Sequence, residues 1–73
     1  MATFAERIKM LRKKKGLSQE ELGSIIGVKK YAIYSYEKEK NYPEVKSLIT
    51  LADYFKVSID YLVGRIDNSD INR

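Results

Sequence analysis

One stretch of the chain constrains its fold more than any other: residues 18–37, with the sequence SQEELGSIIGVKKYAIYSYE. Ser18 is followed three residues later by Glu21, the spacing of a capping box, in which two side chains satisfy free N–H groups at the start of a helix. Three apolar residues then predict one buried face of that helix: Leu22, Ile25 and Ile26. Gly27 is expected to end the helix, because glycine adopts the left-handed conformation of a helix C-terminus without steric cost.

A second short helix is predicted directly after this glycine. Val28 is expected to point inward, and Ile33 and Tyr36, three residues apart, supply the buried side of the helix. Both helices are too short to bury their apolar faces alone, so they must pack against each other at a steep angle. The stretch therefore predicts a helix-turn-helix.

The residues of this motif belong to a wider pattern. It runs Ser18-Gln19-x-x-Leu22, then Gly27-Val28, then Ile33-x-x-Tyr36-Glu37, and finally Pro43. In this pattern the chain resembles DNA-binding domains of the Cro and phage-repressor (XRE) type, from about Phe4 to about Val63. The resemblance implies an all-α, five-helix, lambda-repressor-like domain in which the second and third helices form the helix-turn-helix.

Periodicity and end signals predict the bounds of all five helices. The first is expected over residues 4–15, with Thr3 as N-cap, Gly16 beyond its end, and a core face made of Phe4, Ile8 and Leu11. The second and third are expected over residues 19–26 and 29–38. The fourth should begin at Pro43 or Glu44 and end at residue 55, and Ser58 should cap a fifth over residues 58–63. Residues 1–64 are thus expected to form the DNA-binding domain, and residues 65–73 a polar, disordered tail.

The composition argues against several classes of protein. The 73 residues contain no cysteine and no histidine, so disulfides, thiolate metal sites and the usual general base are missing. No glycine-rich phosphate loop occurs, and no buried pair of carboxylates is expected, so we predict no enzyme, no cofactor, no metal and no evident small-molecule ligand. No apolar run approaches the roughly 20 residues of a membrane span, so no membrane association is expected. The lack of cysteine suits a reducing cytoplasm, where we expect the protein to be located.

The net charge of +4 is unevenly distributed along the chain. Residues 1–40 contain ten Lys or Arg against five Asp or Glu, whereas residues 41–73 contain four against five. The positive half is the one with the helix-turn-helix, as a polyanionic partner would require. Lysines that merely solvate helix surfaces would give the same balance, but together with the motif the charge predicts double-stranded DNA as the partner.

Two structural features follow from the resemblance. In the family an arginine at the position of Arg12 pairs with the glutamate that closes the helix-turn-helix, here Glu37. The family also has a small residue, most often alanine, at the position of Gly23, so that the third helix can cross closely. We therefore expect an ion pair between Arg12 and Glu37, and a steric reason for Gly23, which by itself costs a helix about 1 kcal/mol relative to alanine.

The third helix breaks local rules at its start. Lys29 stands where the family often has Ser or Thr, and two lysines at a helix N-terminus oppose the macrodipole. A DNA phosphate would neutralise them, although a poor cap that is merely tolerated is the alternative. The resemblance implies that this helix enters the major groove, with base contacts from Lys29, Lys30, Tyr31, Tyr34 and Ser35. It implies phosphate contacts from Ser18, Gln19, Lys38, Lys40 and Asn41.

The expected function is that of a sequence-specific transcriptional regulator, most simply a phage-type repressor that binds a pseudo-palindromic operator as a homodimer on DNA. The dimer contact is expected at the corner of the last two helices, from Ser58, Ile59 and Tyr61, although each could instead cover the core. Tyr61 is the favoured residue, because Leu62 and Val63 can already fill the inward positions. A protein-interaction module of the same fold, such as an antitoxin or an anti-repressor partner, is the alternative, since exposed tyrosines are also common hot spots of protein interfaces.

Overall fold

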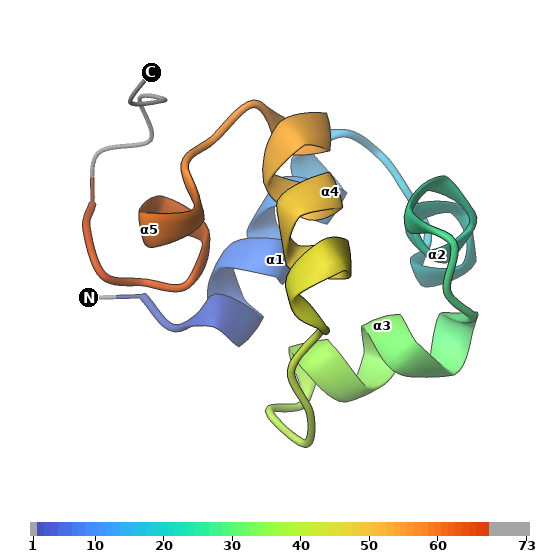
Figure 1. Cartoon of the computed structure of the whole chain (residues 1–73). Helices are drawn as coiled ribbons and strands as arrows, with labels where there is room; N and C mark the ends of the chain where they lie inside the picture. Colours follow the sequence, from blue (N-terminus) through green and yellow to red (C-terminus); the bar gives the residue numbers. More distant parts are fainter. Residues whose placement is uncertain (1, 68–73) are drawn as a thin grey trace.

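The computed structural model describes residues 2–67, which form five α-helices and, within that range, no strand (Figure 1). The helices are α1 (Phe4–Lys14), α2 (Gln19–Ile26), α3 (Lys30–Glu37), α4 (Val45–Phe55) and α5 (Ile59–Leu62). The helix-turn-helix is formed by α2 and α3, with α3 lying across the lower end of the view, below α1 and α4. The all-α, five-helix prediction is confirmed.

Local side-chain signals start three of the helices. The Oγ1 of Thr3 accepts from the N–H of Glu6, whose carboxylate accepts from the N–H of Thr3, which makes a capping box. Ser18 and Glu21 form a second box at the start of α2. Ser58 caps α5, accepting from the N–H of Tyr61 at 3.0 Å. All three N-caps were expected from the sequence.

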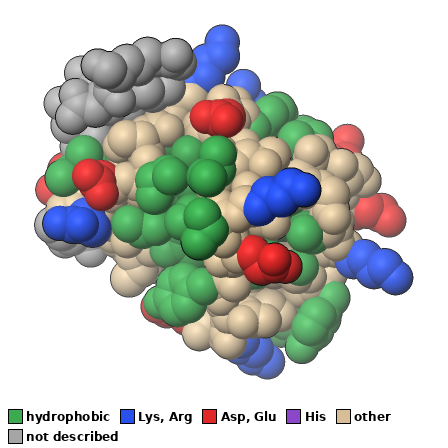
Figure 2. Space-filling model, in the orientation of Figure 1, with side chains coloured by type: hydrophobic (Ala, Val, Ile, Leu, Met, Phe, Trp, Pro, Cys, Tyr) green, Lys and Arg blue, Asp and Glu red, His purple; other side chains and the backbone are tan. Residues whose placement is uncertain are grey.

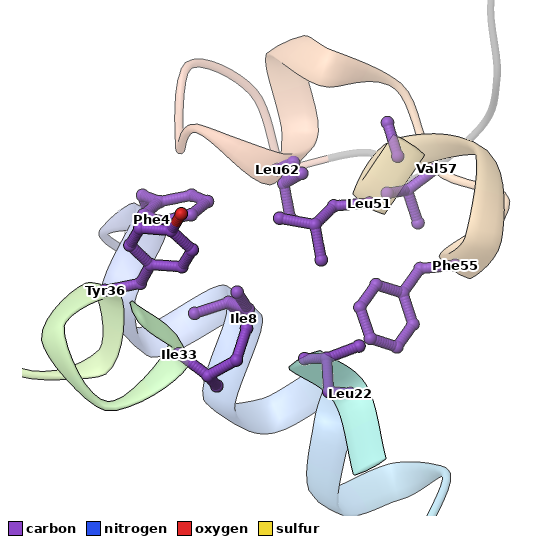
Figure 3. Packing of buried hydrophobic residues seen from close by; sticks show 10 residues of the cluster. Phe4, Ile8, Leu22, Ile33, Tyr36, Leu51, Phe55, Val57 and Leu62 are labelled. Carbon is purple, nitrogen blue, oxygen red and sulfur yellow. The ribbon is translucent and has the colours of Figure 1, made fainter. Parts of the chain in front are cut away.

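The core lies where the five helices meet (Figure 3). The largest fully buried side chains come from all five: Ile8, Leu22, Ile33, Leu51 and Leu62. Aromatic rings close the periphery, with Phe4 and Tyr36 in edge-to-face contact at 6.1 Å between ring centroids. Because every helix contributes to one core, the exposed face of α3 is held in a fixed orientation relative to the rest of the domain.

The buried face of α2 differs from the prediction in one residue. Leu22 and Gly23 are buried and Ile26 is half-buried, but Ile25 is 40% exposed, so its assignment to the apolar face was wrong. At roughly 100° per residue, the first three share one sector of the helix and Ile25 lies outside it. The packing of α2 against α3 selected that sector, which the apolar residues alone did not define.

Several expected boundaries also need correction by one or two residues. Helix α1 ends at Lys14, α3 spans Lys30–Glu37 with Lys29 as its N-cap, and α4 begins at Val45. Helix α5 spans Ile59–Leu62, with Ser58 and Val63 as its caps. Glu44 is the N-cap of α4, so Pro43 lies before the helix instead of in its first turn. Glu44 itself has an extended backbone, with φ of −61° and ψ of 160°.

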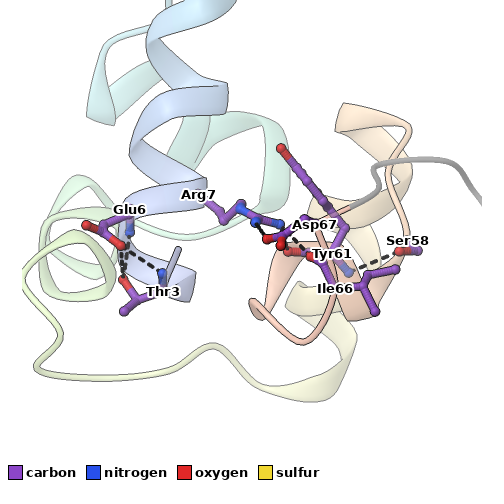
Figure 4. A network of polar contacts seen from close by, with 7 residues as sticks. All are labelled: Thr3, Glu6, Arg7, Ser58, Tyr61, Ile66 and Asp67. Atoms are coloured by element: carbon purple, nitrogen blue, oxygen red, sulfur yellow. Dashed lines mark hydrogen bonds and ion pairs between the residues drawn. The ribbon is translucent and has the colours of Figure 1, made fainter. Parts of the chain in front are cut away.

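The segment after α5 is packed against α1 instead of being free. Arg7, 6% exposed, donates to the carbonyl oxygens of Tyr61 and Ile66 at 2.8 and 2.9 Å, and to the Asp67 carboxylate at 2.8 Å (Figure 4). Residues 65–67 of the predicted tail thus make contacts with α1 and α5. Residues 68–73 of that predicted tail lie outside the described residues.

Candidate nucleic-acid interface

The outer face of α3 presents two tyrosines and a lysine. Tyr31 is 70% exposed and Tyr34 37%, and Lys30 is exposed beside them. The two rings lie 6.2 Å apart between centroids, which makes a continuous aromatic surface on a helix otherwise packed into the core. Such a surface offers two hydroxyl groups, which can donate and accept hydrogen bonds, and apolar rings that can contact thymine methyl groups.

The N-terminus of α3 has no side-chain cap. Lys29 occupies the N-cap with an extended backbone and makes no capping hydrogen bond, and no acidic residue occurs in the first turn. Helix N-termini carry positive partial charge from N–H groups that lack partners, and here Lys29 and Lys30 add two full charges. This end of α3 therefore attracts anions and suits a phosphate group.

The loop after α3 brings two more lysines to the same surface. Glu39 adopts a left-handed conformation, with φ of 59°, and turns the chain so that the N–H of Lys40 donates to the Ser35 carbonyl at 3.0 Å. The ammonium groups of Lys38 and Lys40 each lie 5.8 Å from the centroid of the Tyr34 ring. Asn41 follows on the exposed side of the loop. The loop thus forms a basic margin beside the tyrosines.

Ser35 corrects the predicted set of base contacts. It is 2% exposed, so the exposed position implied by the resemblance is wrong in this structure. The loop that returns after Glu39 is hydrogen-bonded to the backbone of Ser35, through the N–H of Lys40. Four of the five proposed base-contacting residues remain exposed on or beside α3: Lys29, Lys30, Tyr31 and Tyr34.

Glu39 provides a test of this loop. A residue with a Cβ pays about 1–2 kcal/mol in the left-handed conformation, whereas glycine adopts it freely but has more freedom to lose on folding. Glu39→Gly is expected to raise the free energy of unfolding by about 0.5–1 kcal/mol, measured by chemical denaturation. Lys38→Gly, one residue earlier at a φ of −97°, is the matched control and should lower it. A loss of stability in Glu39→Gly as large as in Lys38→Gly would contradict the left-handed turn.

A buried polar cluster fixes α3 to the two preceding helices. Arg12 of α1 binds Glu37 of α3 through both carboxylate oxygens, with Nε–Oε2 at 2.6 Å and Nη2–Oε1 at 3.0 Å. The two side chains are 10% and 4% exposed. Arg12 also donates to the Leu17 carbonyl at 2.7 Å, and Gln19 donates to Glu37 at 3.2 Å. The predicted ion pair is confirmed, and it holds the first residue of α2 beside the last residue of α3.

The same cluster limits what Gln19 can offer to a phosphate. Its amide nitrogen has two N–H groups, of which one is used by Glu37. The other N–H is left for a ligand outside the domain, and so is the O–H of the exposed Ser18, whose oxygen already accepts from the Glu21 N–H. The sequence did not indicate that Gln19 would be anchored by the ion pair.

Two pKa values respond to these local structures. Burial raises the pKa of the Tyr36 phenol above its usual value of 10, and the nearby Glu44 carboxylate adds to the effect. The N–H of Thr3, followed by its hydroxyl, lowers the pKa of Glu6 below its usual 4.5. Tyr36 is buried and Glu6 belongs to α1, so neither group lies on the outer face of α3.

The predicted dimer residues divide into two kinds. Ile59 is 39% exposed, but Tyr61 is half-buried, and the guanidinium of Arg7 lies 3.9 Å from the centroid of its ring. Tyr61 is therefore committed to a contact within the domain, which the sequence did not reveal. Ser58 is half-buried, and its hydroxyl is used for capping. Ile59 is thus the residue of the three that is best exposed for a partner.

Sequence reasoning missed further exposed apolar residues on α4. Val45 is 72% exposed and Ile49 44%, one helical turn apart on the same face. Figure 2 shows hydrophobic side chains gathered on the face that carries α4 and α5. The signal available in the sequence was the pair Val45 and Ile49 itself, four residues apart and about 80° or more around the helix from the core residues Leu51 and Phe55.

Comparison with known families decides the class of this fold. A family model described as "Helix-turn-helix" matches residues 8–62, which include α2, α3 and most of the core. The chain belongs to this family. The resemblance to Cro and phage-repressor (XRE) domains is thereby confirmed, and the relatives are transcription regulators.

Individual relatives give the same result. The chain is 36% identical over 67 residues to an uncharacterized HTH-type transcriptional regulator, YobD of Bacillus subtilis, covering 92% of this chain and 60% of that protein. It is 36% identical over 60 residues to repressor protein C2 of Salmonella phage P22, covering 82% of this chain and 28% of that one. The chain therefore spans about 60% or less of the length of these two relatives.

Solved structures of the family superimpose closely on this one. The crystal structure of the P22 c2 repressor in complex with a synthetic operator has a TM-score of 0.82 at 33% identity and covers 88% of this chain and 97% of that one. A transcriptional regulator from Listeria innocua has a TM-score of 0.83 at 33% identity, and the match covers 90% of this chain and 62% of that one.

Within the described residues, no helix is long and apolar enough to cross a membrane, and no group of three or more Asp and Glu side chains is arranged to hold a metal.

Proposed function

We propose that this helix-turn-helix chain is a sequence-specific, double-stranded DNA-binding transcriptional regulator, a repressor of phage type. The observation that carries the proposal is the match to the operator-bound P22 c2 repressor over nearly the whole of that chain. In this docking mode α3 lies in the major groove, while α2 crosses the backbone. The exposed tyrosines and lysines of α3 and its loop are then the groups that face DNA.

The proposed roles divide into base reading and phosphate binding. Tyr31, the more exposed of the two tyrosines on the outer face of α3, and Lys30 beside it are proposed to contact base edges, with Lys29 and Tyr34 at either side. Phosphate contacts are proposed at the start of α2, from Ser18 and Gln19, and at the loop, from Lys38, Lys40 and Asn41. The anchored position of Gln19, bonded to Glu37, favours a fixed phosphate contact over a flexible one.

The test is to separate specificity from affinity. The operator is first selected from genomic fragments and footprinted. Tyr31→Ala should then flatten the base preference at particular operator positions by about 1–3 kcal/mol, because a direct contact is lost. Lys38→Ala or Lys40→Ala should instead weaken binding to all sequences alike, and each should reduce the slope of log K against log salt by about one.

Lys9→Ala serves as the matched control, since Lys9 is an exposed lysine of α1 outside the proposed surface. It should change neither the base preference nor the salt slope by a comparable amount. An unchanged preference profile in Tyr31→Ala would contradict base reading by α3. Affinity independent of salt would contradict DNA binding and favour the alternative, a protein-interaction module, because phosphate contacts release counterions and a tyrosine-rich protein interface does not.

We further propose that the chain acts as a dimer on DNA. One short helix makes too few base contacts to reject the competing sites of a genome, and two domains on half-sites roughly 34–36 Å apart double the number. The exposed apolar residues available for the contact are Ile59, the first residue of α5, and Val45 and Ile49, which share one face of α4. Such a small patch gives a weak contact, which DNA strengthens by holding both copies close together.

Ile59→Lys tests the dimer contact on a full palindrome and on an isolated half-site. The variant should lose cooperativity and affinity on the palindrome, because two like charges would face each other across the contact. Its half-site affinity and melting temperature should stay close to wild type, since Ile59 is already well exposed. An equal change on both DNAs would place the contact elsewhere or indicate a monomer.

This proposal extends to what the protein does not do. With no histidine or cysteine in the chain and relatives that are transcription regulators, we infer that it is not an enzyme. A regulator of transcription works where the DNA is, so we propose a cytoplasmic location.

A further inference from the structure

A groove lies where the C-terminal ends of α1 and α4 meet, in the upper part of the view in Figure 1, whereas α3 is drawn at the lower end. Arg12 in the last turn of α1 reaches Glu37 at the end of α3, but neither residue lines the groove. Its apolar lining comes from three elements: Met10 and Leu11 of α1, Phe55 and Val57 at the end of α4, and Tyr61 of α5. Met10 is 43% exposed on this surface. Methionine is a flexible side chain that suits the binding of variable apolar partners.

Three lysines surround this apolar lining: Lys14, Lys15 and Lys56. No Asp or Glu is among the lining residues. Part of this charge balances the helix macrodipoles, because α1 and α4 both direct their negative C-terminal ends here. Each of those ends amounts to about half an elementary charge, so the three lysines leave a net positive charge of about two around the groove.

Lys56 is held in a costly backbone conformation at this margin. It is the C-cap of α4 with φ of 57° and ψ of 45°, a left-handed position that glycine or asparagine would adopt with less strain. A lysine at such a position keeps a positive charge at the groove at the expense of stability. Strain of this kind is concentrated at functional sites.

We propose that this groove binds an acidic, amphipathic peptide segment of a partner protein. A large apolar side chain of the segment would lie on Met10, Phe55 and Val57, and its carboxylates would pair with Lys14, Lys15 and Lys56. Because no residue of α3 or of the loop after it lines the groove, such a partner can be bound while α3 is on DNA. The proposal is independent of the DNA-binding function and adds a second partner to it.

A displayed library of random peptides, about 12 residues long and thus about three helical turns, provides the test. Selection on the immobilised chain should enrich peptides with one or two large apolar residues flanked by Asp or Glu. A selected peptide is then synthesised with a fluorescent label, so that its affinity can be measured. The binding site is mapped by NMR, from the changes that the peptide causes in the backbone amide chemical shifts of the isotope-labelled protein. These changes should centre on residues 10–15 and 55–61.

Matched charge variants complete the experiment. Lys14→Gln with Lys56→Asn should weaken peptide binding roughly two- to thirty-fold, the range for the loss of two exposed ion pairs. Lys9→Gln with Lys46→Gln removes the same charge from lysines outside the groove and should have little effect. Met10→Gln should weaken binding through the apolar contact, without a large change in melting temperature, because Met10 is already well exposed.

Several outcomes would overturn the proposal. These are the enrichment of no acidic-apolar peptide, shift changes centred on α3, and equal losses in the two charge pairs. A concentration-dependent increase in mass that is abolished by Met10→Gln would assign the groove to a second copy of the chain. Binding to operator DNA is measured in parallel and should be the same for Met10→Gln as for the wild type. Peptide binding and DNA binding are separate readouts, so failure of one proposal does not imply failure of the other.

Discussion

Replacing Glu37 by glutamine is expected to lower the free energy of unfolding by about 3–5 kcal/mol, the cost of leaving one member of a buried ion pair without its partner. The Arg12 guanidinium would stay buried, bonded only to the Leu17 carbonyl and to a neutral amide. For a domain of this size that loss is a large share of the total stability. Chemical denaturation of wild type and variant, extrapolated to water, measures it.

The chain offers a matched control in a second ion pair. Arg65 and Asp60 lie 3.9 Å apart with side chains 77% and 57% exposed. Asp60→Asn should change the free energy of unfolding by no more than about 1 kcal/mol, since exposed pairs contribute little. If Glu37→Gln cost no more than Asp60→Asn, the Arg12–Glu37 pair would be solvated and the buried network contradicted.

A double replacement distinguishes pairing from packing. Arg12→Met combined with Glu37→Met removes both charges, and it should be less destabilising than the sum of the single changes. Full recovery is not expected, because the Leu17 carbonyl and the Gln19 amide also lose their partners.

The second large effect is expected at Gly23, from replacement by valine. A Cβ at this position would lie 2.6 Å from the Val28 carbonyl oxygen and 3.3 Å from the Lys29 carbonyl carbon. Both are backbone atoms of the turn, which cannot rotate away as a side chain can. We expect a loss of about 3 kcal/mol or more in the free energy of unfolding, toward the upper end of overpacking costs.

Ser24→Val is the control for this change. Ser24 is the next residue of α2 and is exposed, so the same substitution there should alter the free energy of unfolding by about 0.5 kcal/mol or less. Comparable losses in the two variants would indicate that helix propensity, not the close approach of the turn, explains the glycine. The steric reason expected for a small residue at Gly23 is confirmed. The atoms that approach it belong to the turn before α3, however, and not to α3 itself.

The sequence alone determined the features that depend on residues a few positions apart. Caps at Thr3, Ser18 and Ser58 and the left-handed Gly27 were predicted, because each is a hydrogen bond or a backbone conformation set within one turn of chain. The exposure of Tyr31 was also predicted, since it follows from the phase of α3 relative to Ile33 and Tyr36. The Arg12–Glu37 pair was predicted only through the family resemblance.

Tertiary structure alone decided which borderline residues are covered. Ile25 is exposed and Ser35 buried, because burial depends on which sector of a helix its neighbours cover and where the following loop returns. Arg7 is buried with its charge satisfied by two carbonyl oxygens and Asp67, about sixty residues further along the chain. That contact also covers Tyr61 and orders residues 65–67. Hydrophobic periodicity does not contain such information, since these contacts exist only once α1 and α5 have been brought together by the common core.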